Sequence, residues 1–339
     1  MKKVLITGLS GFLASRTAIQ LLDAGYEVIG SVRNLKKGEA VMKIIASQTS
    51  YPEHLSLVEA DLMDADSWKT AVQGMDYVQH IASPFPKVMP KNDDDIVIPA
   101  RDGCLNVLKA AAEAGVKRVV LTSSTGAIGY GKSDHQRKSI FTESDWTNTN
   151  DKKDSTAYFR SKTIAEHAAW DFIKSDQSGM ELSVVCPGAI LGPVLYEDTS
   201  SSINIVLKTM DGSAPAIPPV GFDMVDVRDV ADLLIRAMEK TEAANQRYIG
   251  AAGYRSFKEV AEVLRNHLPG RKIPKRVLPS WALRLFAKLD KSVGAILIEI
   301  GAERKMDNSK AKQQLGWSPR TPEEAIKATA DSIIHLKLA

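Results

Sequence analysis

The chain has the composition of a globular protein: of its 339 residues, 44% are hydrophobic and 25% are charged, which is enough to bury a large core. The formal charge of +3 comes without a basic tract, which argues against nucleic acid as a partner. Cys104 and Cys186 lack metal-ligand spacing, and no apolar run approaches the roughly twenty residues of a membrane span. We therefore expect a cytoplasmic protein with no metal site and no membrane segment.

Short β-branched runs alternate with helical patterns through the first half of the chain. The expected strands are VLIT at 4–7, YEVIGSV at 26–32, LSLVEA at 55–60, DYVQHIA at 76–82, RVVLTSS at 118–124 and LSVVCPGA at 182–189. Helices are expected at 12–24 and 99–114, where Gly25 and Gly115 suit left-handed helix ends. The alternation predicts an α/β fold built on a doubly wound parallel sheet with right-handed crossovers.

A glycine-rich turn, TGLSGFLA at 7–14, follows the first expected strand and opens the first expected helix. Its glycines allow a tight turn and a close approach to pyrophosphate, and the helix N-terminus offers unpaired N–H groups. A glycine pattern alone is a weak signal, but its place between a strand and a helix is the context that a dinucleotide site requires. We therefore expect this turn to contact a dinucleotide through Gly8, Ser10, Gly11, Phe12 and Leu13.

The end of the second expected strand reads GSVRNLKK and carries no acidic residue. NAD-binding proteins place Asp or Glu there, whereas Arg33 with Lys36 or Lys37 could pair with a 2′-phosphate. This favours NADP over NAD, and the alternative is a solvated basic turn. After the third strand, Asp61 and Leu62 are placed to face the adenine, with an ordinary capping role for Asp61 as the alternative.

Two Tyr-x-x-x-Lys pairs occur in the chain. In STAYFRSKTIAE at 155–166, Tyr158 and Lys162 lie four apart in a predicted helix, and the Ser-Thr at its start can cap it. In the second pair, Tyr254 and Lys258, a capping box starting at Ser256 would leave the tyrosine before the helix begins. Only the first pair is therefore expected to share a helix face.

The fifth expected strand ends in Ser123 and Ser124, at the same carboxyl edge as the glycine turn. A serine there is often only a turn residue, but together with Tyr158 and Lys162 it supplies groups that could converge beside a nicotinamide ring. A tyrosine has an ordinary pKa of about 10, and a lysine ammonium nearby favours the phenolate. We expect Lys162 to lower the pKa of Tyr158 and to bond the cofactor ribose.

The second half of the chain has a looser pattern, with Ser- and Pro-rich segments between helices. We expect residues 1–189 to form the nucleotide-binding lobe and residues 190–339 mainly a substrate-binding α+β lobe, with 222–250 returning to the first lobe. No linker separates the two, so a shared cleft is expected.

Taken together, these motifs resemble the extended short-chain dehydrogenase/reductase superfamily, specifically the dihydroflavonol reductase-like branch that includes yeast-type aldehyde and methylglyoxal reductases. The resemblance implies a Rossmann lobe and Ser124, rather than Ser123, as the catalytic serine. It also implies that Ala82 and Ser83 line the nicotinamide end. Pro187 and Gly188 would contribute backbone contacts. The resemblance rests on TGLSGFLA, VIGSVRN, ADLMD, HIASPF, VVLTSS, YFRSK, CPGAILGP, VDVRDVA and DNSKAKQQLGW.

Three departures from related families narrow the expected substrate. Plant dihydroflavonol reductases carry Asn five residues after the catalytic serine, where this chain has Gly129, which argues against a flavonoid. The Tyr-Gly-Lys segment of plant cinnamoyl-CoA reductases is replaced here by FRSK, which argues against a thioester. Sugar-nucleotide dehydratases have Asp-Glu where this chain has Ser124 and Thr125, which argues against dehydration.

The sequence thus leads us to expect an NADPH-dependent carbonyl reductase, acting on a small molecule as a monomer or homodimer. Tyr158 would donate the proton, Ser124 would orient the carbonyl oxygen and Lys162 would support both tyrosine and ribose. A nucleotide-sugar epimerase of the same superfamily and a non-catalytic NADP sensor are the alternatives. Candidates for the substrate wall, each with a plain core role as the alternative, are Phe85, Ile128 and Tyr196.

Overall fold

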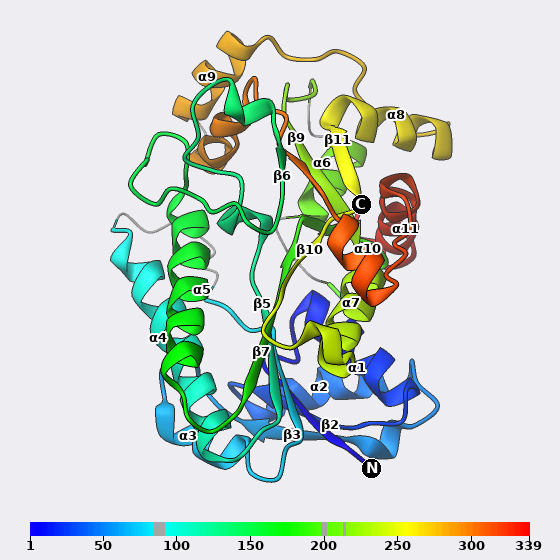
Figure 1. Cartoon of the computed structure of the whole chain (residues 1–339). Helices are drawn as coiled ribbons and strands as arrows, with labels where there is room; N and C mark the ends of the chain where they lie inside the picture. The colour runs from blue at the N-terminus through cyan, green and yellow to red at the C-terminus, as the bar shows by residue number, and fades with distance from the viewer. Residues whose placement is uncertain (85–91, 198–201, 213–214, 290) are drawn as a thin grey trace.

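A parallel sheet of seven strands forms the centre of the computed structural model, which describes residues 1–84, 92–197, 202–212, 215–289 and 291–339 (Figure 1). Every pairing within this sheet is parallel. In spatial order the strands are β10 (Arg247–Gly250), β7 (Glu181–Pro187), β5 (Arg118–Thr122), β4 (Tyr77–His80), β1 (Lys3–Ile6), β2 (Glu27–Val32) and β3 (Leu55–Glu59). The predicted doubly wound parallel sheet is confirmed.

The strand order reverses between β1 and β4, which lie side by side in the middle of the sheet with Leu5 opposite Val78. All five residues of β5 and all four of β4 are buried, as expected for a sheet covered on both faces. In such sheets ligands bind beyond the carboxyl ends of the strands, at the point of reversal. The expected ligand site is therefore the edge of the sheet that carries the glycine turn.

Helices cover both faces of the sheet (Figure 1). One apolar cluster joins the sheet to α1 (Phe12–Asp23), α2 (Leu35–Ala46) and α7 (Val227–Glu239). A second joins it to α3 (Ala65–Ala71), α4 (Asp94–Glu113) and α5 (Ala157–Ser175). Just beyond the ends of α1 and α4, Gly25 and Gly115 have φ of +84° and +73°, which confirms the predicted left-handed ends. Helix α4 begins at Asp94 rather than at 99, so Pro99 lies inside it.

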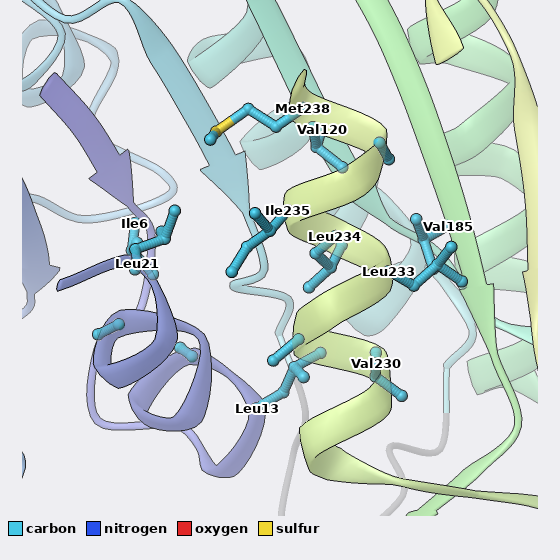
Figure 2. Close-up of a cluster of buried hydrophobic side chains, with 14 of the residues drawn as sticks. Ile6, Leu13, Leu21, Val120, Val185, Val230, Leu233, Leu234, Ile235 and Met238 are labelled. Atoms are coloured by element: carbon cyan, nitrogen blue, oxygen red, sulfur yellow. The ribbon is translucent and has the colours of Figure 1, made fainter. Parts of the chain in front are cut away.

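Helix α7 comes from the second half of the chain but packs on the large sheet. Figure 2 shows its Leu233 and Leu234 among side chains of β5, β7 and α1, including Val120, Val185 and Leu13. All of these are at most 7% exposed. Fully burying a leucine stabilises the fold by about 1.5–3 kcal/mol, so α7 contributes substantially to the core.

A smaller lobe surrounds a three-stranded sheet with the order β11 (Gly253–Ser256), β9 (Gly221–Asp226) and β8 (Ala189–Leu191). Its helices α8 and α11 begin with complete capping boxes, at Ser256 and at Thr321, and the first of these was predicted. A separate parallel pair joins β6 (Ile140–Phe141) to β12 (Lys305–Met306). The remaining helices are α6 (Ile203–Met210), α8 (Phe257–His267), α9 (Ser280–Leu289), α10 (Ser309–Leu315) and α11 (Pro322–His335), and the 3-10 turns are η1 (Pro52–His54), η2 (Thr125–Ala127), η3 (Gln136–Lys138), η4 (Thr241–Ala243) and η5 (Lys291–Glu299).

Two further sequence expectations concern cysteine and membrane segments. Cys104 and Cys186 are both buried free thiols. Within the described part of the chain, no helix combines the length and apolarity needed to cross a lipid bilayer.

Candidate functional site

The glycine turn lies at the carboxyl end of β1 and is held from β2. Gly8 has φ of +69°, and the N–H of Gly11 donates to the carbonyl of Gly8 at 2.9 Å, which closes the turn. The N–H of Gly8 itself donates to the hydroxyl of Ser31 at 3.1 Å. Gly11 is the N-cap of α1, and no side chain of the described residues caps it, so the first helical N–H groups face outward from the turn. This geometry suits a pyrophosphate.

A second segment, at the end of β4, approaches the same turn. A Cβ atom added to Gly8 would lie 2.9 Å from the Cβ of Ala82, so only glycine allows this contact. The hydroxyl of Thr7 accepts from the N–H groups of Ile81 and Ala82 at 3.0 and 2.9 Å. Ala82 and Ser83 are therefore held beside the glycine turn.

The Thr7 hydroxyl has one further partner, His80, whose Nδ1 lies 3.0 Å away. Since the Thr7 oxygen already accepts two N–H groups, its proton points to Nδ1, and His80 is neutral. Burial, followed by the charge of Lys162, lowers the pKa of His80 to about 3. Thr7, Ser31 and His80 belong to the site but were missed from the sequence, because a lone Thr, Ser or His inside a strand run carries no distinguishing pattern.

Basic and polar residues follow β2 at the start of α2. Arg33 and Lys37 are exposed, and Asn34 caps the helix by accepting from the N–H of Lys37 at 3.0 Å. A helix N-terminus with Arg33, Lys36 and Lys37 nearby suits an anion.

Asp61 and Leu62 follow β3 at the same edge of the sheet. The carboxylate of Asp61 accepts from the N–H of Met63 at 2.8 Å, and α3 is capped by Asp64 instead. Leu62 is half-buried and packs against Gly103 of α4. The capping alternative for Asp61 does not hold, because the cap lies three residues later.

Pro187 and Gly188 occupy the carboxyl end of β7. The N–H of Gly188 donates to the carbonyl of Gly250 at 3.2 Å. A Cβ on Gly188 would lie 2.4 Å from the carbonyl oxygen of Asp223, so the smaller lobe closes tightly on this strand end.

Ser124, Tyr158 and Lys162 come together at this edge. Thr156 caps α5 by accepting from the N–H of Phe159 at 3.2 Å, so Tyr158 and Lys162 lie in its first turns. The Ser124 hydroxyl accepts from the N–H of Gly126 at 3.0 Å, and it lies close enough to the Tyr158 hydroxyl to lower the pKa of that phenol. The Lys162 ammonium donates to the carbonyl of Thr122 at 3.2 Å.

The electrostatics of this cluster differ from the expectation for its tyrosine. Burial raises the pKa of Tyr158 to about 12, opposed by the Ser124 hydrogen bond. Burial also lowers the pKa of Lys162 to about 8. The expected lowering of the Tyr158 pKa by Lys162 is therefore wrong for this structure, because burial of the phenol dominates and Ser124, not Lys162, is the group that opposes it.

The two serines that follow β5 have separate partners. Ser123 is 5% exposed, and its hydroxyl donates to a carboxylate oxygen of Glu166 at 2.5 Å. Ser124 instead bonds Tyr158. The second expected Tyr-Lys pair is divided as predicted, with Tyr254 in β11 and Lys258 in α8.

The three substrate-wall candidates have different outcomes. Phe85 lies outside the described residues. Ile128 has no exposed surface and packs in the core with Phe141, so its role as a substrate wall is withdrawn in favour of the core alternative. Tyr196 is half-buried, and its hydroxyl donates to the carbonyl of Ser10 at 2.6 Å. Tyr196 thus contacts the glycine turn.

Side chains also fill the space beside Gly129. A Cβ added there would lie 3.1 Å from Met306 and 3.5 Å from Arg304. Arg304 donates through Nε to the carbonyl of Gly129 at 2.9 Å and pairs with Glu299 at 2.6 Å. A larger residue at this position would have to displace these side chains.

A turn that fits pyrophosphate, beside a serine, tyrosine and lysine at one sheet edge, defines an enzyme that uses a dinucleotide. The model of the NAD dependent epimerase/dehydratase family matches residues 4–250, and the chain belongs to that family. Tetraketide alpha-pyrone reductase 1 of Arabidopsis thaliana is 39% identical, over 81% of this chain and 83% of the relative. Cinnamoyl-CoA reductase 1 of the same plant is 36% identical, over 81% and 77% respectively.

Among solved structures, yeast methylglyoxal/isovaleraldehyde reductase Gre2 in complex with NADPH matches with a TM-score of 0.83. It is 29% identical and covers 99% of each chain. These likenesses confirm the resemblance to extended short-chain dehydrogenase/reductases of the dihydroflavonol reductase-like branch. The chain is an oxidoreductase.

Proposed function

We propose that this NADP-dependent oxidoreductase reduces the carbonyl group of small aldehydes and ketones, with Tyr158 as the proton donor. The observation that carries the proposal is that Ser124 lies beside the Tyr158 hydroxyl, while Lys162 follows Tyr158 one turn later on α5. A sensor that only binds the nucleotide would need no such arrangement.

In this reaction a carbonyl becomes an alcohol by gaining a hydride at carbon and a proton at oxygen. NADPH, when bound, supplies the hydride. Tyr158 gives its proton to the carbonyl oxygen, which Ser124 holds by a second hydrogen bond, and a proton from solvent later restores the phenol. Positioned proton transfer of this kind typically contributes about 10²- to 10⁴-fold in rate.

The protonation states of Tyr158 and Lys162 support proton transfer from Tyr158 to the carbonyl oxygen. With a pKa of about 12, Tyr158 is protonated at neutral pH, which is the form that donates. Lys162, with a pKa of about 8, is mostly charged there and stabilises the phenolate as it forms.

For the cofactor, we propose that the glycine turn holds the pyrophosphate and that Arg33 and Lys37 hold the 2′-phosphate. Tyr196, which reaches the turn through Ser10, would lie near the phosphates. Asp61 and Leu62 would face the adenine. The nicotinamide would lie near Ala82, Ser83, Pro187 and Gly188.

For the substrate, we propose simple aldehydes, diketones and ketoesters. Gly129 has no side chain to bond distant substrate hydroxyls, and Met306 and Arg304 occupy the space beside it. A pocket without such a bond discriminates by only about 1–3 kcal/mol per methylene, so kcat/KM should change gradually with chain length. The name of yeast Gre2, a methylglyoxal/isovaleraldehyde reductase, agrees with this class.

The test is loss of NADPH absorbance with a panel of aldehydes, diketones and ketoesters, with dihydroflavonols as competitors. Turnover across the panel is expected. Exclusive reduction of a polyhydroxylated flavonoid would overturn the substrate class, whereas no net NADPH oxidation with any carbonyl would favour an epimerase or a sensor.

A further inference from the structure

A buried carboxylate, Glu166, lies on the same helix as Tyr158 and Lys162, one turn beyond the lysine. Tyr158, Lys162 and Glu166 are spaced four apart, so they share one face of the helix. Glu166 is 1% exposed and lies two turns beyond Tyr158. A carboxylate this deeply buried needs several hydrogen-bond partners to remain charged.

Glu166 has partners on three other elements. Ser123, directly after β5, donates to its Oε2 at 2.5 Å, and Arg247 of β10 donates through Nε to its Oε1 at 2.5 Å and through Nη2 to its Oε2 at 3.1 Å. The indole N–H of Trp170 and the thiol of Cys186 lie at 3.3 and 3.8 Å. The carboxylate thus joins α5 to β5, β7 and β10.

Arg247 extends this network to the segment that follows Ser124. Its Nη2 donates to the carbonyl of Ala127 at 3.3 Å, in the 3-10 turn η2 that Ser124 caps. Its Nη1 donates to the carbonyls of Glu143 and Asp145 at 2.9 and 2.7 Å. The guanidinium also lies 3.8 Å from the ring centre of Trp146.

These contacts anchor the chain on both sides of Ser124. Ser123, immediately before it, bonds Glu166 directly, and Ala127, three residues after it, bonds Arg247, which is itself paired with Glu166. Tyr158 is carried by the same helix as Glu166. Glu166 is therefore bonded, directly or through Arg247, to the chain on both sides of Ser124, and it lies on the helix that carries Tyr158.

We propose that Glu166 is a positioning residue: through Ser123 and Arg247 it holds the Ser124 hydroxyl against the Tyr158 hydroxyl. This inference rests on the proposed carbonyl reduction, in which Ser124 and Tyr158 both bond the carbonyl oxygen. A displacement of about 1 Å in such a group can reduce the rate about 10²-fold.

The test compares Glu166→Gln and Ser123→Ala with Glu181→Gln. Glu181 also pairs with an arginine, Arg118, at 2.6 Å, but at the amino ends of β7 and β5, away from the site. Both network variants should lose about 10- to 100-fold in kcat, with the KM for NADPH nearly unchanged. Glu181→Gln should retain the wild-type kcat even where it lowers the melting temperature. A network variant with wild-type kcat would overturn the proposal.

A double variant tests whether Glu166 acts through Ser123. If it does, adding Ser123→Ala to Glu166→Gln should reduce kcat by much less than the product of the two separate losses. Fully multiplicative losses would contradict that route. If Glu166→Gln does not fold, the kcat of Ser123→Ala alone tests the proposal. That variant removes one hydrogen bond and leaves the ion pair between Arg247 and Glu166 intact.

A crystal structure of Ser123→Ala gives an answer that does not depend on activity. We expect the distance between the Ser124 Oγ and the Tyr158 Oη to be longer in this variant than in a crystal structure of the wild type. An unchanged separation would overturn the inference. A wild-type protein that oxidises no NADPH with any carbonyl would instead overturn the proposed function. The distance between Ser124 Oγ and Tyr158 Oη in the variant would still test whether Glu166 positions these two groups.

Discussion

Ser123 and Ser124 are neighbours in the chain, yet their hydroxyls bond different parts of the protein. Ser123 is turned into the core, where it bonds Glu166 at 2.5 Å, and Ser124 faces Tyr158 at the edge of the sheet. Both serines follow Thr122, the last residue of β5, and only Ser124 faces the tyrosine. The different orientation of the two side chains is the reason that Ser124, and not Ser123, can take part in the proposed reaction.

The first prediction separates the two Tyr-Lys pairs. Tyr158→Phe removes the proposed proton donor and should reduce kcat about 10²- to 10⁴-fold while NADPH still binds, because the ring remains in place. Tyr254→Phe removes only a 3.4 Å bond to the carbonyl of Ala302 and should change kcat little. Steady-state kinetics and NADPH fluorescence titration check both. A greater loss in folded Tyr254→Phe would reverse the assignment.

The second prediction concerns cofactor preference. Arg33→Asp replaces a cation beside the proposed 2′-phosphate with an anion, so the ratio of kcat/KM for NADPH to that for NADH should fall about 10- to 100-fold. Lys43→Asp makes the same charge change in the last turn of α2 and is the control. Equal ratios in wild type and Arg33→Asp would show that Arg33 does not contact the phosphate.

The third prediction is a pH dependence of the reduction. Lys162, with a pKa of about 8, is charged below that pH and neutral above it. Since only the charged form stabilises the Tyr158 phenolate, kcat should be highest below about pH 8 and should fall as the pH rises through it. Lys162→Met should have a low kcat at every pH, and its kcat should not fall further as the pH rises through about 8. Profiles measured from about pH 6 to about pH 10 decide, and a wild-type kcat that stays level through pH 8 contradicts the role of the lysine.

The fourth prediction concerns acid stability. The pKa of His80 is about 3 in the folded protein and about 6.5 when unfolded, so the unfolded state binds more protons between these values. This term is fully favourable above about pH 6.5 and is lost as the pH falls, by up to about 1.4 kcal/mol per pH unit.

His80→Asn keeps an acceptor near Thr7 but cannot be protonated, so its free energy of unfolding should fall less between neutral and mildly acidic pH. Urea unfolding at several pH values measures the difference. His135→Asn, at an exposed position, is the control and should follow the wild type. The same acid slope in His80→Asn would show that His80 does not carry this term.

The sequence by itself determined the features that depend on neighbouring residues. The alternation of β-branched runs with helical patterns predicted six of the seven strands of the large sheet, all but β10. Gly25 and Gly115 marked helix ends because a positive φ is a local demand. The capping box at Ser256 separated Tyr254 from Lys258 for the same reason. The glycine turn was recognisable because its tight turn is encoded in a few consecutive residues.

Only the tertiary structure decided which distant groups meet. Glu166 bonds Ser123 and Arg247 across 43 and 81 residues of chain, and no local pattern encodes such separations. Ile128 looked like a pocket residue and is core because Phe141, from another segment, packs with it. The pKa of Tyr158 depends on how far the folded protein removes its hydroxyl from water, and that desolvation cannot be read from neighbouring residues in the sequence.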